Sequence, residues 1–433
     1  MTNLKNPESA LNRVIGKLGY SAISINGVIG AGIFGLPAVA AARVGAFSPW
    51  VFLVAGLLIF TVVLSFARAA SMVRETGGVV VYATKAFGPF FGFQAGWLGY
   101  LSRVASIAAN TNLLVTYASW FWAPLDVDPG RAIAVSLVIG SLTWLNVVGV
   151  KNSIGMLYVF TVLKLLPLSL LILFGLGHVD LQMLAGAEIP EVGSWGETIL
   201  VVLYAYVGFE GTVVTAGEGR SPRRDMPRAL IDTILFIGVV YVLVQVVSIS
   251  VLPDLASSPT ALADVANVLF GGIGATVLTL GAIFSIGGNS MSSIISAPRM
   301  LFALARDGSM PASLARVHER HHTPHVSILL YGALSLALAL SGSFIWLAVM
   351  STLVRLITYI MCIVAIPFLE KSEEAIDDQF TLPGGYLIPA IALLLCLWLI
   401  THANADAWLT IGGFTALGTL MYLWSTRWAK AAE

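Results

Sequence analysis

A run of glycines interrupts the first long apolar segment. Gly27, Gly30, Gly32 and Gly35 fall within nine residues, and Pro37 follows them. Inside a helix, glycine costs about 1 kcal/mol and proline about 3 kcal/mol relative to alanine, so the run predicts a break. Lipid cannot satisfy the opened backbone groups, so such a break is tolerated where it lines a cavity or a site. The run predicts a site for the carboxylate and amine of a small ligand, with close helix packing as the alternative.

Lys164 stands in the middle of another apolar segment, 153–176. A lysine at the centre of a bilayer costs several kcal/mol unless it is paired or neutral, and it marks a functional site by default. Burial favours the neutral form of a lysine, so Lys164 is a candidate for proton exchange. The alternative is a fixed structural tie that never titrates, and the sequence leaves both open.

Arg103 and Glu210 are two further ionisable residues in apolar segments. We expect them to form a buried ion pair. The alternative is that Arg103 meets an acidic side chain of a ligand. We expect Arg355 near a helix end or in a cytoplasmic gate.

Composition excludes several classes of protein. Of 433 residues, 58% are hydrophobic and 11% are charged, whereas soluble domains are about 25% charged. The chain is therefore a multi-pass membrane protein, and we expect no cleavable signal peptide. Zero net charge argues against a nucleic-acid partner.

Cys362 and Cys396 lie in apolar segments and are typical of core residues. A histidine cluster at 318–325 lies among charged residues and indicates a solvated linker, so we expect no metal site and no cofactor.

Apolar stretches long enough to span a bilayer, about 20 residues each, occur twelve times in the chain. The eighth is too long for one crossing, and its start is expected along the membrane surface. The predicted spans are 17–42, 47–71, 87–118, 131–149, 153–176, 196–217, 229–252, 267–304, 325–341, 344–368, 385–402 and 407–426.

Lysine and arginine gather in alternate loops and in both tails, which predicts that these parts are cytoplasmic. The opposite loops carry few basic residues and several acids. Both termini are therefore expected in the cytoplasm of a cell membrane protein, as an even number of spans also requires. The basic residues of the cytoplasmic set are Lys5, Arg13, Lys17, Arg74, Lys85, Lys151, Arg220, Arg223, Arg224, Arg228, Arg306, Arg316, Arg320, Lys371, Arg427 and Lys430.

The sixth segment has a second weak point around Tyr204, Val207 and Gly208. The first and sixth segments each begin a group of five, and five is odd, so the second group starts from the opposite face. Interrupted helices at matching positions of two inverted halves indicate a transporter site at the membrane midplane. The expected units are 1–180, 181–370 and a pair of extra helices in 371–433.

Several short motifs together resemble the amino acid–polyamine–organocation superfamily of permeases. They come in the family's order and cover most of the first ten segments. The motifs are GAGIF at 30–34, GFE at 208–210, AGE at 216–218, SPRRDMPR at 221–228 and RDGSMP at 306–311.

The resemblance implies an all-α fold with the 5+5 inverted repeat of the leucine transporter and two further helices. It also implies a secondary active transporter that moves amino acids by alternating access and is not an enzyme. Amides of Gly30, Ala31 and Gly32 would hold the substrate carboxylate, as helix N-termini attract anions. Carbonyls around the two breaks would bind its ammonium, and Tyr204 would act as an aromatic gate, with a packed aromatic as the alternative. The carbonyl residues are Val28, Ile29, Tyr204 and Val207, with Gly208 beside them, and Glu210 is assigned to coupling.

The resemblance further implies that Lys164 replaces a sodium ion, as in proton-coupled and sodium-independent branches of the family. It would bridge the backbone of Asn26 or Gly27 and the hydroxyl of Ser285. Proton symport, exchange and uniport stay open, as does the identity of the amino acid. A channel is disfavoured because no ring-forming selectivity motif is present, and a non-transporting sensor remains an alternative. The expected partners are an amino-acid substrate, protons and the lipid bilayer.

Overall fold

The computed structural model describes residues 15–73, 75–149, 154–372, 380–382 and 384–432. Every regular element in these ranges is a helix, and one isolated bridge joins Ile15 to Gly219. Four residues that entered the orientation prediction, Lys5, Arg13, Arg74 and Lys151, lie outside the described residues.

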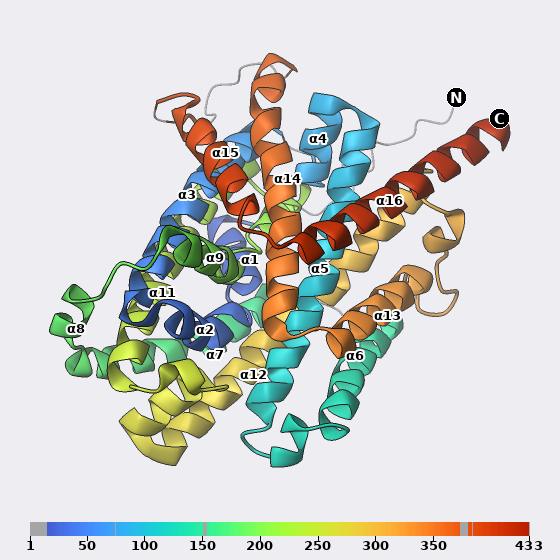
Figure 1. Ribbon diagram of the computed structural model, residues 1–433. Coiled ribbons are helices and arrows are strands. Elements are labelled where there is room, and N and C mark those ends of the chain that lie inside the picture. The colour runs from blue at the N-terminus through green and yellow to red at the C-terminus, as the bar shows by residue number, and fades with distance from the viewer. Residues whose placement is uncertain (1–14, 74, 150–153, 373–379, 383, 433) are drawn as a thin grey trace.

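Helices cover each of the predicted apolar ranges, and short helices lie between some of them (Figure 1). In chain order the α-helices are α1 (Lys17–Val28), α2 (Gly32–Val44), α3 (Ser48–Met72), α4 (Val79–Phe87), α5 (Pro89–Ala118), α6 (Gly130–Val148), α7 (Ile154–Gly175), α8 (Leu181–Ala185), α9 (Val192–Val202), α10 (Glu210–Val213), α11 (Pro222–Val251), α12 (Ala261–Arg306), α13 (His325–Ser341), α14 (Phe344–Ser372), α15 (Leu387–Ile400) and α16 (Ala405–Ala432).

Seven helical stretches in the described chain are long and apolar enough to cross a membrane, which supports a multi-pass membrane protein. The 30-residue α5 is long enough but is not among them. Its buried face carries polar residues, among them Asn110, Thr111 and Asn112, which lower its hydropathy. The full count of twelve crossings stays a prediction. Figure 1 shows α5 running through the middle of the bundle beside α14, which it contacts along with α12.

The first predicted break lies between α1 and α2. Helix α1 ends at Val28, and the backbone of Ile29, Gly30 and Ala31 is irregular until α2 begins at Gly32. Gly27 lies in α1, and Gly32 and Gly35 lie in α2, so the glycine run is divided between two half-helices.

The second predicted break lies between α9 and α10. A 3₁₀ turn over Leu203–Ala205 follows α9, and the chain stays irregular up to Glu210. Gly208 has φ +114°, a conformation that a side chain would strain. A Cβ built on Gly27 would lie 2.7 Å from the carbonyl oxygen of Gly208, so the two breaks cross at glycines.

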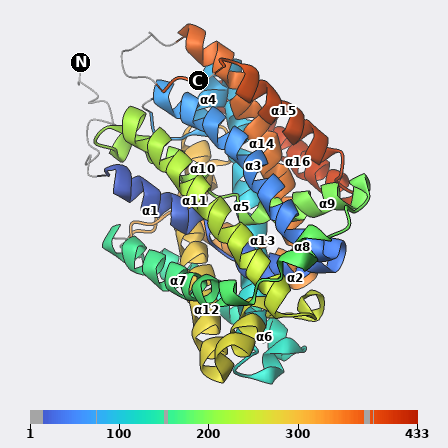
Figure 2. The same cartoon turned by 90° about the vertical axis from the view of Figure 1, so that its left-hand side faces the viewer.

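Two smaller features also position the site. Helix α12 is divided at Gly271 (φ 68°), so its first ten residues leave the axis of the long segment, and their expected place along the membrane surface stays a prediction. Ile15, two residues before α1, is hydrogen-bonded to the end of the sixth segment. Its amide donates to Glu218 O (3.1 Å), and the Arg220 amide donates to Ile15 O (2.9 Å). In Figure 2, α1 and α10 lie near each other, and they are in contact.

The crossing of the two breaks predicts the effect of Gly208→Ala. The new methyl group would meet the backbone of Gly27, and the positive φ would add strain of about 1–3 kcal/mol. We expect a clearly lower thermal unfolding temperature in detergent. The matched control is Gly412→Ala in α16, where nothing lies within 4 Å of the added Cβ. Equal unfolding temperatures for the two variants would contradict a close crossing.

Candidate functional site

The first break presents backbone donors without partners. The amides of Gly30, Ala31 and Gly32 donate to no described acceptor, while the amides of Phe34 and Gly35 donate to Ala31 O (3.1 and 3.0 Å). They stand at the N-terminal end of α2, where the helix dipole favours an anion. These are the three residues that the sequence analysis assigned to a carboxylate.

Unpaired acceptors lie beside these donors. The carbonyl oxygens of Val28, Tyr204 and Val207 accept from no described donor, and all three residues are buried. They come from both breaks, which contact each other at Gly27 and Gly208. A buried carbonyl without a partner is costly, so this cluster is suited to a ligand with several N–H donors.

Asparagines link the breaks to the surrounding helices. The Tyr204 hydroxyl donates to Asn110 Oδ1 (2.9 Å), and Asn110 Nδ2 donates to Asn289 Oδ1 (2.9 Å). Asn289 Nδ2 in turn donates to the carbonyls of Asn26 (2.9 Å) and Gly27 (2.8 Å). Sequence reasoning missed Asn110 and Asn289, although uncharged amides within apolar helices could have drawn attention to them.

Tyr204 lies between this network and an aromatic neighbour. Its hydroxyl is also 3.2 Å from Ser106 Oγ, and its ring packs edge-on against Phe344 with centroids 6.0 Å apart. The side chain therefore has fixed contacts at both ends, and its assignment as a gate stays a prediction.

Lys164 lies at the first break and is completely buried. Its Nζ donates to Ile29 O (2.7 Å), and Ser285 Oγ donates to the same oxygen (3.3 Å). The expected bond to the backbone of Asn26 or Gly27 is not present, and the side chain of Asn289 donates to both of those carbonyls.

Asn26 contacts helix α7 through its side chain instead. Its Nδ2 donates to Leu157 O (3.0 Å) and to Thr161 Oγ1 (2.7 Å), one turn before Lys164. Two adjacent turns of α7 therefore bind α1, one at Asn26 and one at the carbonyl where α1 ends.

Glu210 follows the second break and is held by three donors. Its oxygens accept from Arg355 Nε (2.7 Å), the Tyr359 hydroxyl (2.9 Å) and the Gly208 amide (2.9 Å). The predicted pair of Glu210 with Arg103 is wrong, since the partner is Arg355 of α14. Arg355 is 5% exposed and lies in the middle of α14, so the expectation of a helix end is wrong.

Arg103 has a neutral partner. Its Nη1 donates to Ser296 Oγ of α12 (3.0 Å), and no described carboxylate lies within 4.0 Å of the guanidinium nitrogens. Unlike Arg355, Arg103 is only partly buried. The structure therefore places a guanidinium near the second break without an ion-pair partner.

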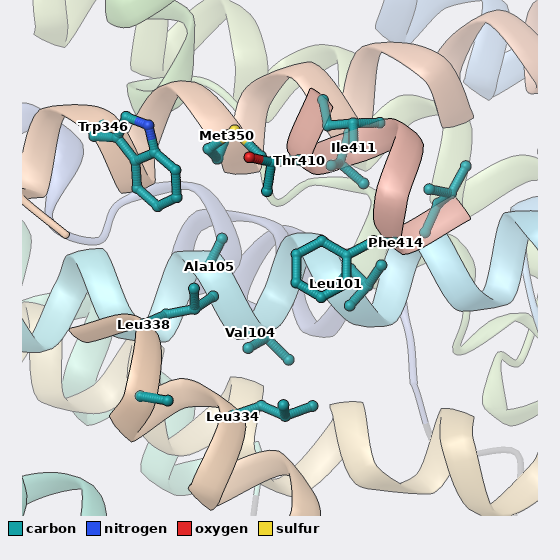
Figure 3. Close-up of a pocket in the computed structure, with 13 residues that line it drawn as sticks. Leu101, Val104, Ala105, Leu334, Leu338, Trp346, Met350, Thr410, Ile411 and Phe414 are labelled. Carbon is teal, nitrogen blue, oxygen red and sulfur yellow. The ribbon is translucent and has the colours of Figure 1, made fainter. Parts of the chain in front are cut away.

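An apolar pocket lies on another face of α5. It has a volume of about 200 Å³, and Figure 3 shows its lining of aliphatic and aromatic side chains between α5, α13, α14 and α16. The hydroxyl of Thr410 in its wall donates to the backbone of Asp406. A charged amine and carboxylate would find no partners there, so this pocket does not compete with the breaks as a polar site.

The described residues contain no group of three or more His, Cys, Asp or Glu side chains placed to hold a metal ion. In the histidine cluster, His318 Nδ1 accepts from the amides of Arg320 (3.2 Å) and His321 (3.3 Å). His318 thus closes a local turn.

The Glu210–Arg355 pair predicts an asymmetric effect of substitution. Arg355→Gln leaves a buried carboxylate without its cation and should destabilise the protein by about 3–5 kcal/mol. The double variant Glu210→Gln with Arg355→Gln should regain part of the loss, because neither partner is then charged. Thermal unfolding of these two variants and of the wild type checks this. Arg103→Gln, which breaks no described ion pair, is the matched control and should lose less. A variant Arg355→Gln as stable as the wild type would contradict the pairing.

Comparison with known proteins shows the family of this chain. The amino acid permease family matches residues 15–424. The chain is 27% identical to the branched-chain amino acid permease BcaP of Bacillus subtilis, over 98% of this chain and 95% of that protein. It is 27% identical to the serine/threonine exchanger SteT of the same organism (89% and 90% covered) and 25% identical to its methylthioribose transporter (96% and 94%). These relatives are transporters and not enzymes, and this chain belongs to the amino acid permease family.

Proposed function

We propose that this protein is a secondary active transporter that carries α-amino acids across the cell membrane by alternating access, independently of sodium. The observation that carries the proposal is the set of unpaired backbone groups at the two breaks. Three amides suit a carboxylate, and three carbonyls suit an ammonium group. An α-amino acid has both groups on one carbon and could satisfy both sets at once.

The relatives support an amino-acid substrate without fixing its side chain. The names of the branched-chain permease and of the serine/threonine exchanger refer to amino acids with different side chains. All of these amino acids have the same α-amino and α-carboxylate groups. The site fits this pattern, because its free groups are backbone atoms that contact the common part of any amino acid. One relative is an exchanger, so exchange of internal for external substrate is the second candidate for the mode of transport.

Sodium independence rests on the position of Lys164. Its ammonium is bonded to the carbonyl at the end of α1, and a fixed cation there would repel a sodium ion. Lys164 and Ser285 converge on Ile29 O from α7 and α12. This arrangement ties the first break to two neighbouring helices, a role that a sodium ion could otherwise fill.

The proposed arrangement in the membrane follows the sequence analysis: twelve crossings, the 5+5 inverted repeat in 1–180 and 181–370, two further helices in 371–433, and both termini in the cytoplasm. In this arrangement α1 and α10 are the cytoplasmic halves of the two broken helices. Ile15, just before α1, is hydrogen-bonded to Glu218 and Arg220 after α10, which favours movement of the two halves as one unit.

Uptake measurements distinguish a carrier from a channel or a sensor. Purified protein in proteoliposomes should show saturable uptake of an amino acid, and internal substrate should accelerate entry of labelled substrate. Linear uptake without saturation would indicate a channel. Binding without uptake would indicate a sensor. Either result would overturn the proposal.

The position of Lys164 predicts how uptake depends on the cations present. We expect uptake to be unchanged when sodium is replaced with potassium or choline. Lys164→Ala should weaken substrate binding by about tenfold, because the end of α1 loses its charged bond. Ser285→Ala, the matched control, removes a neutral bond to the same oxygen and should cost less. Sodium-dependent uptake by the wild type would contradict the assignment of Lys164.

The pH profile of the same variants decides the role of the lysine. If Lys164 exchanges a proton, uptake rises as external pH falls, substrate entry acidifies the lumen, and Lys164→Ala removes the pH dependence. If Lys164 is a structural tie, the variant lowers activity and leaves the shape of the profile unchanged. Only differential interaction with the two conformations can couple a proton to transport.

A further inference from the structure

One positive charge remains after the ionisable groups near the second break are paired. Arg103 and Arg355 carry two positive charges and Glu210 carries one negative charge, which leaves a net charge of +1. The carboxylate of Glu210 is fully engaged by Arg355, Tyr359 and the Gly208 amide. Arg103 has the neutral hydroxyl of Ser296 as its described hydrogen-bond partner.

The guanidinium of Arg103 lies beside the site. Its Nη2 is 3.7 Å from a Cβ built on Gly211, three residues after Gly208 of the second break. Along α5, Arg103 is three residues from Ser106, which corresponds to about 4.5 Å of helix rise. Ser106 contacts the hydroxyl of Tyr204 at 3.2 Å. The guanidinium thus lies against the segment that follows the second break, and its helix also carries the hydroxyl that contacts Tyr204.

The guanidinium has capacity for a further ligand. An arginine has five N–H donors, and the described bonds of Arg103 use a single nitrogen, Nη1. Arg103, Gly211 and Ser296 are all partly exposed, whereas Lys164 and Arg355 are buried. None of the Arg103 nitrogens is among the buried atoms without a partner. The donors without a described partner, Nε and Nη2, therefore keep at least a small accessible surface.

We propose that Arg103 binds a carboxylate on the side chain of the substrate, so that the transporter selects short acidic α-amino acids of the aspartate and glutamate type. This inference rests on the proposed amino-acid transport. The unpaired backbone groups bind the α-amino and α-carboxylate groups, and the guanidinium binds the second carboxylate. An anionic side chain brings the net charge of the three-residue cluster from +1 to zero. Charge-assisted, two-pronged contacts make arginine well suited to this role.

A purely structural role is the competing explanation. Arg103 would then serve to hold α5 against α12 through Ser296. Arg103→Gln separates the two roles, because glutamine keeps a donor for the serine hydroxyl and removes the charge. Arg103→Lys keeps the charge and removes the planar fork of donors.

The test compares acids with their amides, which have similar shape and no side-chain charge. Wild-type protein in proteoliposomes is given labelled glutamate, with unlabelled glutamate, aspartate, glutamine, asparagine and leucine as competitors. We expect glutamate or aspartate to compete at least tenfold better than its amide. Arg103→Gln should weaken binding of the acids by about 10- to 100-fold and change binding of the amides by less than about threefold. Arg103→Lys should retain part of the preference.

The matched control is Arg427→Gln, which removes an exposed arginine near the end of α16 and should leave every competition constant unchanged. The competition assay on the wild type needs no variant, so it remains decisive if Arg103→Gln does not fold.

Three results would overturn the inference. Equal competition by an acid and its amide in the wild type would do so. A folded Arg103→Gln variant that loses all substrates equally would assign Arg103 to structure. Uptake or binding of neutral amino acids with no effect of glutamate or aspartate would remove the acidic selectivity and leave the proposed transport function standing. Absence of binding and uptake for every amino acid would instead remove both proposals.

Discussion

The structure depends on how backbone groups opened inside a membrane find partners. Each unpaired N–H or C=O group in a bilayer is costly, and lipid offers no substitute. At the two breaks the protein supplies some of these partners itself. Asn289 binds the carbonyls of Asn26 and Gly27, Lys164 and Ser285 bind that of Ile29, and Glu210 accepts the amide of Gly208. The groups that remain unpaired come from both breaks, and these are the groups to which we assign the ligand.

The same constraint explains the composition of the central helix. Asn110 and Ser106 of α5 face the network around Tyr204, and Arg103 lies one turn further along the helix. These residues reduce the hydropathy of α5, so its length rather than its composition marks it as a possible span. A helix that lines a polar site gives up apolar surface, which is tolerated because the polar face is turned away from lipid.

The sequence allowed both breaks and the buried lysine to be predicted, because glycine runs and a charge inside an apolar segment are costly and therefore conspicuous. It left open whether the glycines serve a site or packing, and the structure shows close packing at two of them. Gly30 faces Asn289, while Gly32 lies directly against the backbone of Ala205.

The partners of the charged residues could not be predicted. Glu210 pairs with Arg355, 145 positions along the chain, and only the packing of α14 brings them together. Asn110 and Asn289 were missed because a neutral amide stands out less than a charge. The short helices α4 and α8 were missed because neither is a long apolar segment.

The distribution of the bonds indicates how a ligand at the breaks could favour one conformation. The free amides belong to the start of α2, whereas the free carbonyls belong to the end of α1 and to the turn after α9. Helix α1 is linked to the segment after α10 through Ile15, and α2 contacts α9. A zwitterion that binds both sets connects the start of α2 to the end of α1 and to the turn after α9. The protein itself makes no described hydrogen bond between these atoms. Its interaction energy therefore depends on their separation, and such a difference between arrangements is what a substrate needs in order to shift a conformational equilibrium.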